Sequence, residues 1–302
     1  MQVEEILSFP AKTLSSAQRE TYFNTGYLLL PAFLDQQLLA RLNEVAAEFV
    51  EQSRHIEKSD AKFDLEPNHT AENPRLRRLS FPVAHHEVFR QLAFDSAIVD
   101  LAEDLLGPNV CYHHSKLNYK WSGGGEEIKW HQDIQYWPHT DFSPLTIGIY
   151  LHDVDEAMGP MGVVPGSHKG PLFDLRDEHG KWLGAIRDDE LDQAHVSSAD
   201  YLQGPAGSVT VHNCCSVHGS LPNNSPRPRP LLLQTYTAGD SFPLQTVGAN
   251  GLGQYANKMI RGERPQFTKV NGKNVPVAPD WSAGYTSIID VQQGSKKNNL
   301  NE

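Results

Sequence analysis

The sequence predicts a mainly β protein with helices, in which a double-stranded β-helix, the jelly-roll core of cupin-like proteins, carries packed N-terminal helices. Apolar residues recur at helical spacing before residue 107, whereas short β-rich runs alternate with Gly, Pro and Asn turns from residue 109 onward. Many short strands favour a sandwich or barrel, and a double-sheet jelly roll limits exposed sheet edges. We expect a single domain over residues 1–302, with a mainly helical part (14–107), a jelly-roll core (108–240) and a C-terminal extension (241–302).

Residues 15 to 53 are expected to form two helices separated by a short strand. Ser15 and Gln18 have the spacing of a capping box, which starts a helix. The strand is GYLLLPAFL, and the next helix repeats apolar residues at helical spacing at Leu38, Leu42, Val45, Phe49 and Val50. A second helical region covers residues 86–106, and Gly107-Pro108 supplies its stop signal.

Six β-rich runs follow, separated by turn residues. They are VCYHHSKLNYKW, IKWHQDIQYW, LTIGIYLHDV, MGVVPGS, GSVTVHN and RPLLLQTYT. These runs are the expected strands of the jelly roll.

Composition narrows the classes of function. The net charge of −11 and the pI near 5.7 argue against a nucleic-acid partner, because a phosphate backbone would be repelled. No apolar run approaches the roughly 20 residues of a membrane span, and MQVEEILSFPAKTL lacks the pattern of a secretory signal. Cys111, Cys214 and Cys215 are too few for a disulfide framework. We expect a cytoplasmic protein with a small-molecule substrate, as a monomer or a homodimer.

A mononuclear iron(II) that activates oxygen needs two imidazoles and one carboxylate on one face, with open positions for co-substrate and dioxygen. Residues two apart on a strand point the same way, so a His-x-Asp pair delivers two such ligands. The chain offers His131/Asp133 and His139/Asp141. The second pair follows Pro138 and runs into a Ser-Pro turn, which favours a loop. We therefore favour His131 and Asp133.

The alternation in IKWHQDIQYW predicts that Gln135 and Trp137 share the face of His131 and Asp133. The third ligand is expected to be His218, which follows the run GSVTVHN, with His212 on the same run as its competitor.

Arg229 supports His218, because it lies eleven residues further on at the start of another apolar strand. A guanidinium binds a carboxylate bidentately and stays charged at any working pH, which suits the distal carboxylate of 2-oxoglutarate. The other end of 2-oxoglutarate would chelate the iron.

Several segments together resemble the phytanoyl-CoA dioxygenase family, which includes the ectoine hydroxylases. They are LSSAQRETYFNTGYLLLPAFLDQQLLARL, SAIVDLAEDLLGPNV, WHQDIQYWPH, GPMGVVPGSHKGP and HGSLPNNSPRPR, and they cover nearly the whole length. The resemblance implies Fe(II) as cofactor, 2-oxoglutarate and O2 as co-substrates, and release of succinate and CO2. It assigns the iron to His131, Asp133 and His218, and the 2-oxoglutarate to Arg229 rather than Arg227.

The same resemblance implies that Asn118 and Ser220 contact 2-oxoglutarate and that Trp137 lies near the substrate. Relatives that halogenate replace the acidic ligand with a small residue. Since Asp133 is present, the resemblance implies hydroxylation or another two-electron oxidation such as desaturation. His114 stands where ectoine hydroxylases carry Gln, which argues against ectoine as the substrate.

The substrate is expected to be a small polar or amphipathic metabolite. Trp137, Gln135 and His114 are candidates to line its cavity, and Arg77, with its neighbours Arg75 and Arg78, is a candidate to meet an anionic group. Three alternatives remain: an acyl-CoA hydroxylase of the same fold, a non-catalytic metal-binding jelly-roll protein, and a zinc hydrolase.

Overall fold

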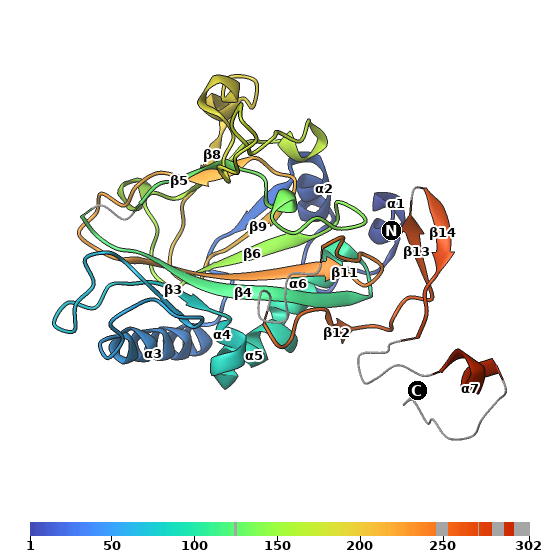
Figure 1. The fold of residues 1–302 in the computed structure, drawn as a ribbon, viewed down its shortest axis with the longest axis horizontal. Coiled ribbons are helices and arrows are strands. Elements are labelled where there is room, and N and C mark those ends of the chain that lie inside the picture. The colour runs from blue at the N-terminus through green and yellow to red at the C-terminus, as the bar shows by residue number, and fades with distance from the viewer. Residues whose placement is uncertain (124–125, 246–252, 271, 280–286, 293–302) are drawn as a thin grey trace. The chain divides into compact units, whose positions relative to one another are not determined.

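The computed structural model describes residues 1–123, 126–245, 253–270, 272–279 and 287–292 (Figure 1). The chain divides into two compact units, Met1–Arg264 and Pro265–Glu302. In the second unit, β13 (Phe267–Val270) and β14 (Lys273–Pro276) form an antiparallel pair, and α7 spans Ile288–Gln292. Every element described below belongs to the first unit.

Two antiparallel sheets face each other in the first unit (Figure 1). The large sheet has the order β1 (Tyr27–Leu30), β9 (Val209–Asn213), β6 (Leu145–Tyr150), β11 (Arg229–Ala238), β4 (Val110–Lys120), β3 (Leu76–Ser80) and β2 (Phe63–Leu65), and β12 (Lys258–Arg261) also pairs with β4. The small sheet has the order β5 (Ile128–His131), β10 (His218–Ser220), β7 (Met161–Val163) and β8 (Asp200–Leu202). This is the expected double-stranded β-helix.

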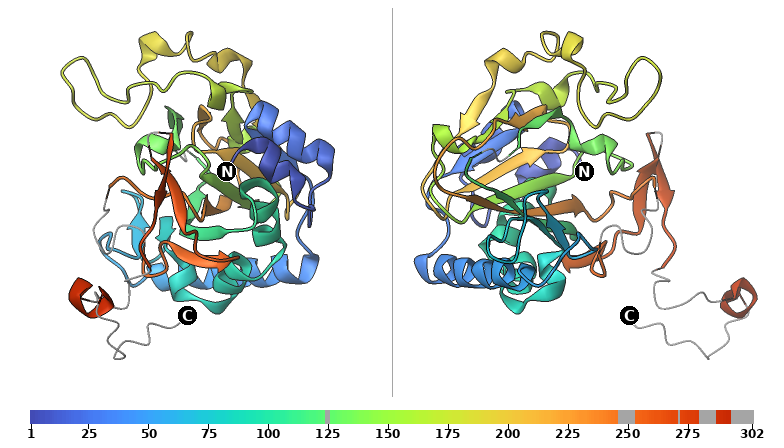
Figure 2. Two further views of the ribbon diagram at one scale, coloured as in Figure 1. Left: turned by 90° about the vertical axis from the view of Figure 1, so that its right-hand side faces the viewer. Right: turned by 60° about the vertical axis from the view of Figure 1, so that its left-hand side comes forward.

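Helices cover the outer face of the large sheet, as both views of Figure 2 show for the long helix α3. The α-helices are α1 (Val3–Ser8), α2 (Ser16–Thr25), α3 (Gln36–Ser53), α4 (Pro82–His85), α5 (Glu87–Phe94) and α6 (Ala97–Leu106). The 3-10 turns are η1 (Asp133–Gln135), η2 (Glu156–Met158), η3 (Ser167–Lys169), η4 (Asp188–Glu190) and η5 (Val196–Ser198). None of the helices in the described residues is long and apolar enough to cross a membrane.

The main hydrophobic core lies between these helices and the large sheet. Leu117 and Tyr119 of β4 and Leu232 and Tyr236 of β11 are buried in it together with apolar side chains of α3, α5 and α6. Successive side chains of a strand point to opposite faces. The intervening residues of β4 and β11 therefore point the other way, toward the small sheet, and that inner space contains the site.

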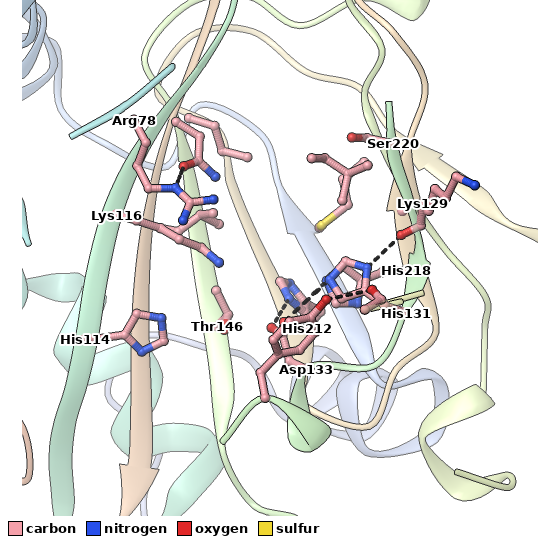
Figure 3. A pocket seen from close by; sticks show the side chains of 18 of the residues that line it. Arg78, His114, Lys116, Lys129, His131, Asp133, Thr146, His212, His218 and Ser220 are labelled. Atoms are coloured by element: carbon pink, nitrogen blue, oxygen red, sulfur yellow. Dashed lines mark hydrogen bonds and ion pairs between the residues drawn. The ribbon is translucent and has the colours of Figure 1, made fainter. Parts of the chain in front are cut away.

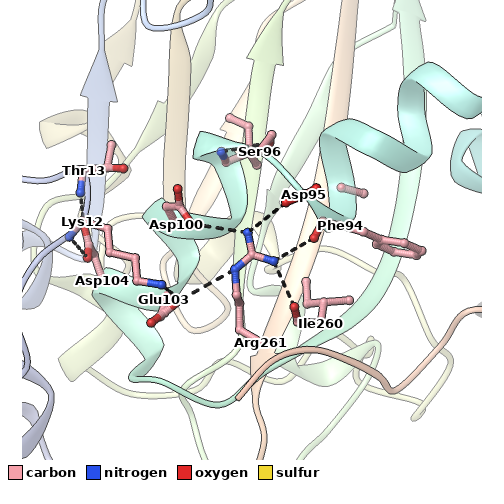
Figure 4. A network of polar contacts seen from close by, with 12 residues as sticks. Lys12, Thr13, Phe94, Asp95, Ser96, Asp100, Glu103, Asp104, Ile260 and Arg261 are labelled. Atoms are coloured by element: carbon pink, nitrogen blue, oxygen red, sulfur yellow. Dashed lines mark hydrogen bonds and ion pairs between the residues drawn. The ribbon is translucent and has the colours of Figure 1, made fainter. Parts of the chain in front are cut away.

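Polar contacts fix α6 to distant parts of the chain (Figure 4). The buried carboxylate of Asp104 accepts hydrogen bonds from the backbone N–H groups of Lys12, Thr13 and Leu14 at 2.7–2.9 Å. Arg261 of β12 donates to the carbonyl oxygen of Phe94 at 2.9 Å and lies 3.4 Å from Asp100. Because buried backbone donors need partners, these contacts hold the helical layer on the sheet.

Most of the predicted elements are present. The capping box of Ser15 and Gln18 is confirmed at the start of α2, and the region 86–106 is helical but is interrupted at Asp95, with Ser96 capping α6. The part 14–107, expected to be mainly helical, also contains β2 and β3. The strand expected over IKWHQDIQYW ends at His131, because the chain turns into η1 at Asp133.

Candidate active site

A cavity of about 620 Å³ lies between the large and small sheets. Eight of the ten residues singled out in the sequence line it: His114, Asn118, His131, Asp133, Trp137, His218, Ser220 and Arg229. They come from β4, β11, β5, β10 and the turn after β5, which places both sheets in contact with the same space.

His131, Asp133 and His218 form the one cluster among the described residues whose ligand atoms could hold a metal ion. Their ligand atoms lie within 4.8 Å of one another. The Nε2 atoms of His131 and His218 are 3.6 and 4.0 Å from Asp133 Oδ1. Two imidazoles and one carboxylate are the donor set of a facial triad.

The fold brings these three residues together through the small sheet. His131 and His218 are direct partners in the antiparallel pair β5–β10. Gly219 allows the close packing of β10, since a Cβ there would lie 2.9 Å from the carbonyl oxygen of Ile128. After β5, Gln132 donates to the carbonyl oxygen of Cys215 at 2.7 Å and so holds the turn that presents Asp133.

The histidines are arranged to offer their Nε2 atoms to a metal. His131 Nδ1 lies 2.8 Å from the carbonyl oxygen of Lys129, and His218 Nδ1 lies 3.0 Å from that of Ser216. A carbonyl oxygen accepts a hydrogen bond from Nδ1–H, which fixes the tautomer and leaves the Nε2 lone pair free to bind a metal. The residues present therefore fit an Fe(II) ion.

The surroundings of His218 and Asp133 favour the protonation states that bind a metal ion. Burial lowers the pKa of His218 well below its usual range, and the neighbouring His131 and His212 lower it further, so the ring is neutral. Burial alone would raise the pKa of Asp133, but its contacts with His131 and His212 outweigh this and hold the pKa well below the usual range. Neutral imidazoles and an ionised carboxylate are the required ligand forms.

His212, the competitor for the third position, also lies in this cluster. It projects from β9, is 2% exposed, and its Nε2 is 3.5 Å from Asp133 Oδ2. Its ring packs against that of His218 with the centroids 4.4 Å apart and the ring planes tilted by 44°. His212 thus lies beside the carboxylate, on the large sheet, whereas both histidines of the triad lie on the small sheet.

Arg229 begins β11 and is buried, with 4% of its surface exposed. Its Nε and Nη1 atoms have no hydrogen-bond partner among the described residues. Burial lowers the pKa of Arg229, yet a guanidinium remains charged. A buried cation without a partner is costly, so this side chain fits an anionic ligand.

Lys120 and Ser220 lie next to this arginine. Lys120 is the direct partner of Arg229 in the pair β4–β11, and it donates to Ser220 Oγ at 2.8 Å and to the carbonyl oxygen of Leu221 at 2.5 Å. Burial, followed by repulsion from Arg229, lowers the pKa of Lys120 to about 7. This end of the cavity is therefore built for negative charge.

The inner face of β4 faces the metal ligands across the cavity (Figure 3). His114, Lys116 and Asn118 alternate along it, and Arg78 of β3 lies beside Asn118 and donates to its Oδ1 at 2.9 Å. Burial lowers the pKa of His114 to about 3, so this histidine is neutral.

Two expected substrate residues do not line the cavity. Gln135 donates to the carbonyl oxygen of Phe173, because η1 replaces the expected strand and breaks the period of two after Asp133. Arg77 lies 3.6 Å from Asp64, and Arg78 occupies the cavity position instead. Lys116 lines the cavity and was missed, although it lies at the same alternating spacing as His114 and Asn118. Lys120 was also missed; it does not line the cavity but contacts Ser220, which does.

Comparisons with known proteins agree with this geometry. The phytanoyl-CoA dioxygenase (PhyH) family model matches residues 22–231. The chain belongs to the phytanoyl-CoA dioxygenase family. The matched region contains His131, Asp133 and His218 and also Arg229.

Several dioxygenases are similar to this chain in sequence. A probable alpha-ketoglutarate-dependent hypophosphite dioxygenase of Stutzerimonas stutzeri is 32% identical over 84% of this chain and 88% of its own length. An ectoine dioxygenase of Bordetella parapertussis is 30% identical over 76% of this chain and 77% of its own.

Solved structures show the same fold. EctD from S. alaskensis in its apoform superposes with a TM-score of 0.68 at 25% identity, covering 85% of this chain and 90% of that one. The structure of that protein with 2-oxoglutarate and 5-hydroxyectoine has a TM-score of 0.64 at 25% identity, covering 77% and 80%.

Proposed function

We propose that the protein hydroxylates an unactivated C–H bond of a small metabolite, with release of succinate and CO2. The class of enzyme follows from the family and its relatives: the chain is a 2-oxoglutarate-dependent dioxygenase that uses Fe(II) and O2. We assign the iron to His131, Asp133 and His218, and the distal carboxylate of 2-oxoglutarate to Arg229.

One observation carries this assignment: a His-Asp-His cluster and a buried arginine without a partner line the same cavity. A zinc hydrolase or a structural metal site would need the cluster but would leave the charge of Arg229 unexplained. A dicarboxylate co-substrate accounts for both features, because one end can chelate the metal while the other pairs with the guanidinium.

The chain positions and shields the reactants. Bound iron supplies the oxidation of the substrate together with O2 and 2-oxoglutarate. His131 and His218 are held by backbone carbonyl oxygens, so both imidazoles stay directed at the metal. Leu231 and Leu233 of β11 give the cavity an apolar wall that excludes water beside Arg229.

Asn118 and Ser220 are proposed to help hold 2-oxoglutarate. Both line the cavity, and Ser220 Oγ receives a hydrogen bond from Lys120, which leaves its own hydrogen free to be donated to a carboxylate. Trp137 and His114 lie together, with ring centroids 6.1 Å apart, and we propose them as substrate contacts.

Hydroxylation is favoured over halogenation, because Asp133 occupies the position that a halide would need. The relatives support a small substrate, because they are named for the oxidation of hypophosphite, ectoine and L-proline. We further propose that the enzyme has one catalytic domain. We also propose a cytoplasmic location, which agrees with the three free buried cysteines.

The proposal is tested by adding 2-oxoglutarate anaerobically to the protein with Fe(II) and recording the weak visible charge-transfer band of the chelate. The band is expected in the wild-type protein and should be lost in Asp133→Ala. Iron binding without this band would refute 2-oxoglutarate as co-substrate and favour a binding protein. Competition by coenzyme A in a turnover assay would instead favour an acyl-CoA substrate.

A further inference from the structure

Two cations that line the cavity form no ion pair with any of the described residues. Arg78 and Lys116 line the wall that faces the metal ligands. Arg78 uses its Nε atom to bind Asn118, while its terminal nitrogens and the Lys116 ammonium have no hydrogen bond or ion pair within the part of the chain that the structure describes. Neither side chain is needed for the metal or for Arg229.

The two cations lie side by side at the end of the large sheet. Arg78 pairs with Asn118 and Ser80 pairs with Lys116 in the antiparallel ladder β3–β4, so both side chains emerge from neighbouring strands. Burial lowers the pKa of Lys116; Asp133 raises it in part, and the like charge of Arg78 lowers it further. Like charges that are placed together on a cavity wall are typical of an anion site.

The charges of Arg78 and Lys116 are not balanced when the metal and 2-oxoglutarate are bound. The metal, Asp133, Arg229 and a dianionic 2-oxoglutarate balance one another. Glu127 and Lys129 are exposed, line the same cavity and have opposite signs. His114 is neutral because its pKa is about 3. Lys120 does not line the cavity and donates its hydrogen bonds to Ser220 and to the carbonyl oxygen of Leu221. Among the lining residues, the remaining positive charge belongs to Arg78 and Lys116.

We propose that Arg78 and Lys116 hold an oxyanion group of the substrate, which makes the substrate a small acid bearing a carboxylate or a phosphorus oxyanion. This inference rests on the proposed function and deepens it. The oxyanion is anchored on the large sheet, and the rest of the substrate extends toward the metal on the small sheet. Arg78 and Lys116 thus select the substrate and orient its reacting bond.

The test uses isothermal titration calorimetry on the protein with Fe(II) and 2-oxoglutarate under anaerobic conditions, where no turnover occurs. Methylphosphonate and acetate are the charged probes, and acetamide is the uncharged probe. We expect the charged probes to bind more tightly than acetamide. Lys116→Met and Arg78→Met should each weaken that binding about ten- to a hundredfold, the effect of losing one charge-assisted hydrogen bond.

Two matched variants separate charge from structure. Lys116→Arg keeps the charge and should retain binding of the charged probes. Arg77→Met removes a cation from the same strand that does not line the cavity, and it should bind the probes as the wild-type protein does. Tighter binding of methylphosphonate than of acetate would assign a phosphorus oxyanion, and the reverse order would assign a carboxylate.

Two results would overturn the inference. The first is equal binding of acetamide and acetate by the wild-type protein. The second is loss of 2-oxoglutarate affinity in Lys116→Met or Arg78→Met with unchanged probe binding, since these residues would then hold the co-substrate. The 2-oxoglutarate titration is done first: no binding there would refute the proposed function, which keeps the two failures distinguishable.

Discussion

Replacing Arg229 with Met should have opposite effects on ligand binding and on stability. The guanidinium is 4% exposed, and its Nε and Nη1 atoms have no partner among the described residues. A bidentate carboxylate would make two charge-assisted hydrogen bonds worth about 1.5–3 kcal/mol each. Their loss should weaken 2-oxoglutarate binding by about 10²- to 10⁴-fold.

In the unliganded protein the same substitution removes buried donors that lack partners, which cost about 1–3 kcal/mol. Met has a similar length and is apolar, so the Tm of unliganded Arg229→Met should rise by a few degrees. Anaerobic calorimetry with 2-oxoglutarate and thermal unfolding without it measure the two effects on one preparation.

Arg227→Met is the matched control, because Arg227 is half-exposed and pairs with Asp155 at 2.8 Å. It should leave the affinity for 2-oxoglutarate unchanged. A lower Tm together with unchanged affinity in Arg229→Met would refute the reasoning, since Arg229 would then be a structural arginine.

Three further predictions concern the same cavity. Asp133→Ala should lose Fe(II), measured as metal content after gel filtration, and retained iron would move the metal site elsewhere. Gln135→Ala should lower the Tm, because its bond to the carbonyl oxygen of Phe173 is lost, yet leave 2-oxoglutarate affinity unchanged; a large change in affinity would return Gln135 to the cavity. Lys120 has a pKa of about 7, and a bound dianion favours its charged form, so 2-oxoglutarate should bind most tightly below about pH 7 and more weakly as the pH rises. Lys120→Met should flatten this dependence in calorimetry, and an unchanged slope would assign the dependence to another group.

The closeness of His131 and Asp133 could be predicted because residues two apart in an extended segment point the same way. His131 and Asp133 needed only the alternation up to residue 133, and the structure keeps β5 extended up to His131. Gln135 was misplaced because the hydrogen bonds that turn the chain after His131 come from the distant residues Cys214 and Cys215. No pattern within IKWHQDIQYW contains those partners.

The cavity wall formed by β3 and β4 shows a different limit of sequence-based prediction. The pattern that places Lys116 there is local to β4, but it was not used. His114, Lys116 and Asn118 alternate along one strand, so placing His114 and Asn118 in the cavity already implied Lys116 between them. The choice between Arg77 and Arg78 was not local. It depends on the register of β3 against β4, which pairs Arg78 with Asn118, and a short strand next to helices gives no sign of that register in its own sequence.

The register of β3 against β4 also explains why the metal ligands are easier to predict from a sequence than the cations that face them. Two of the metal ligands belong to one short motif and the third is a distant histidine, so the metal site depends on a few positions. The cations that face them come from separate strands, β3 and β4, and become a site only when the large sheet forms. A second substrate chemistry can therefore be obtained on this sheet by changing Arg78 or Lys116 while the iron and 2-oxoglutarate residues stay in place. The two metal-binding histidines lie on the small sheet, whereas Arg229 and the proposed oxyanion residues lie on the large sheet.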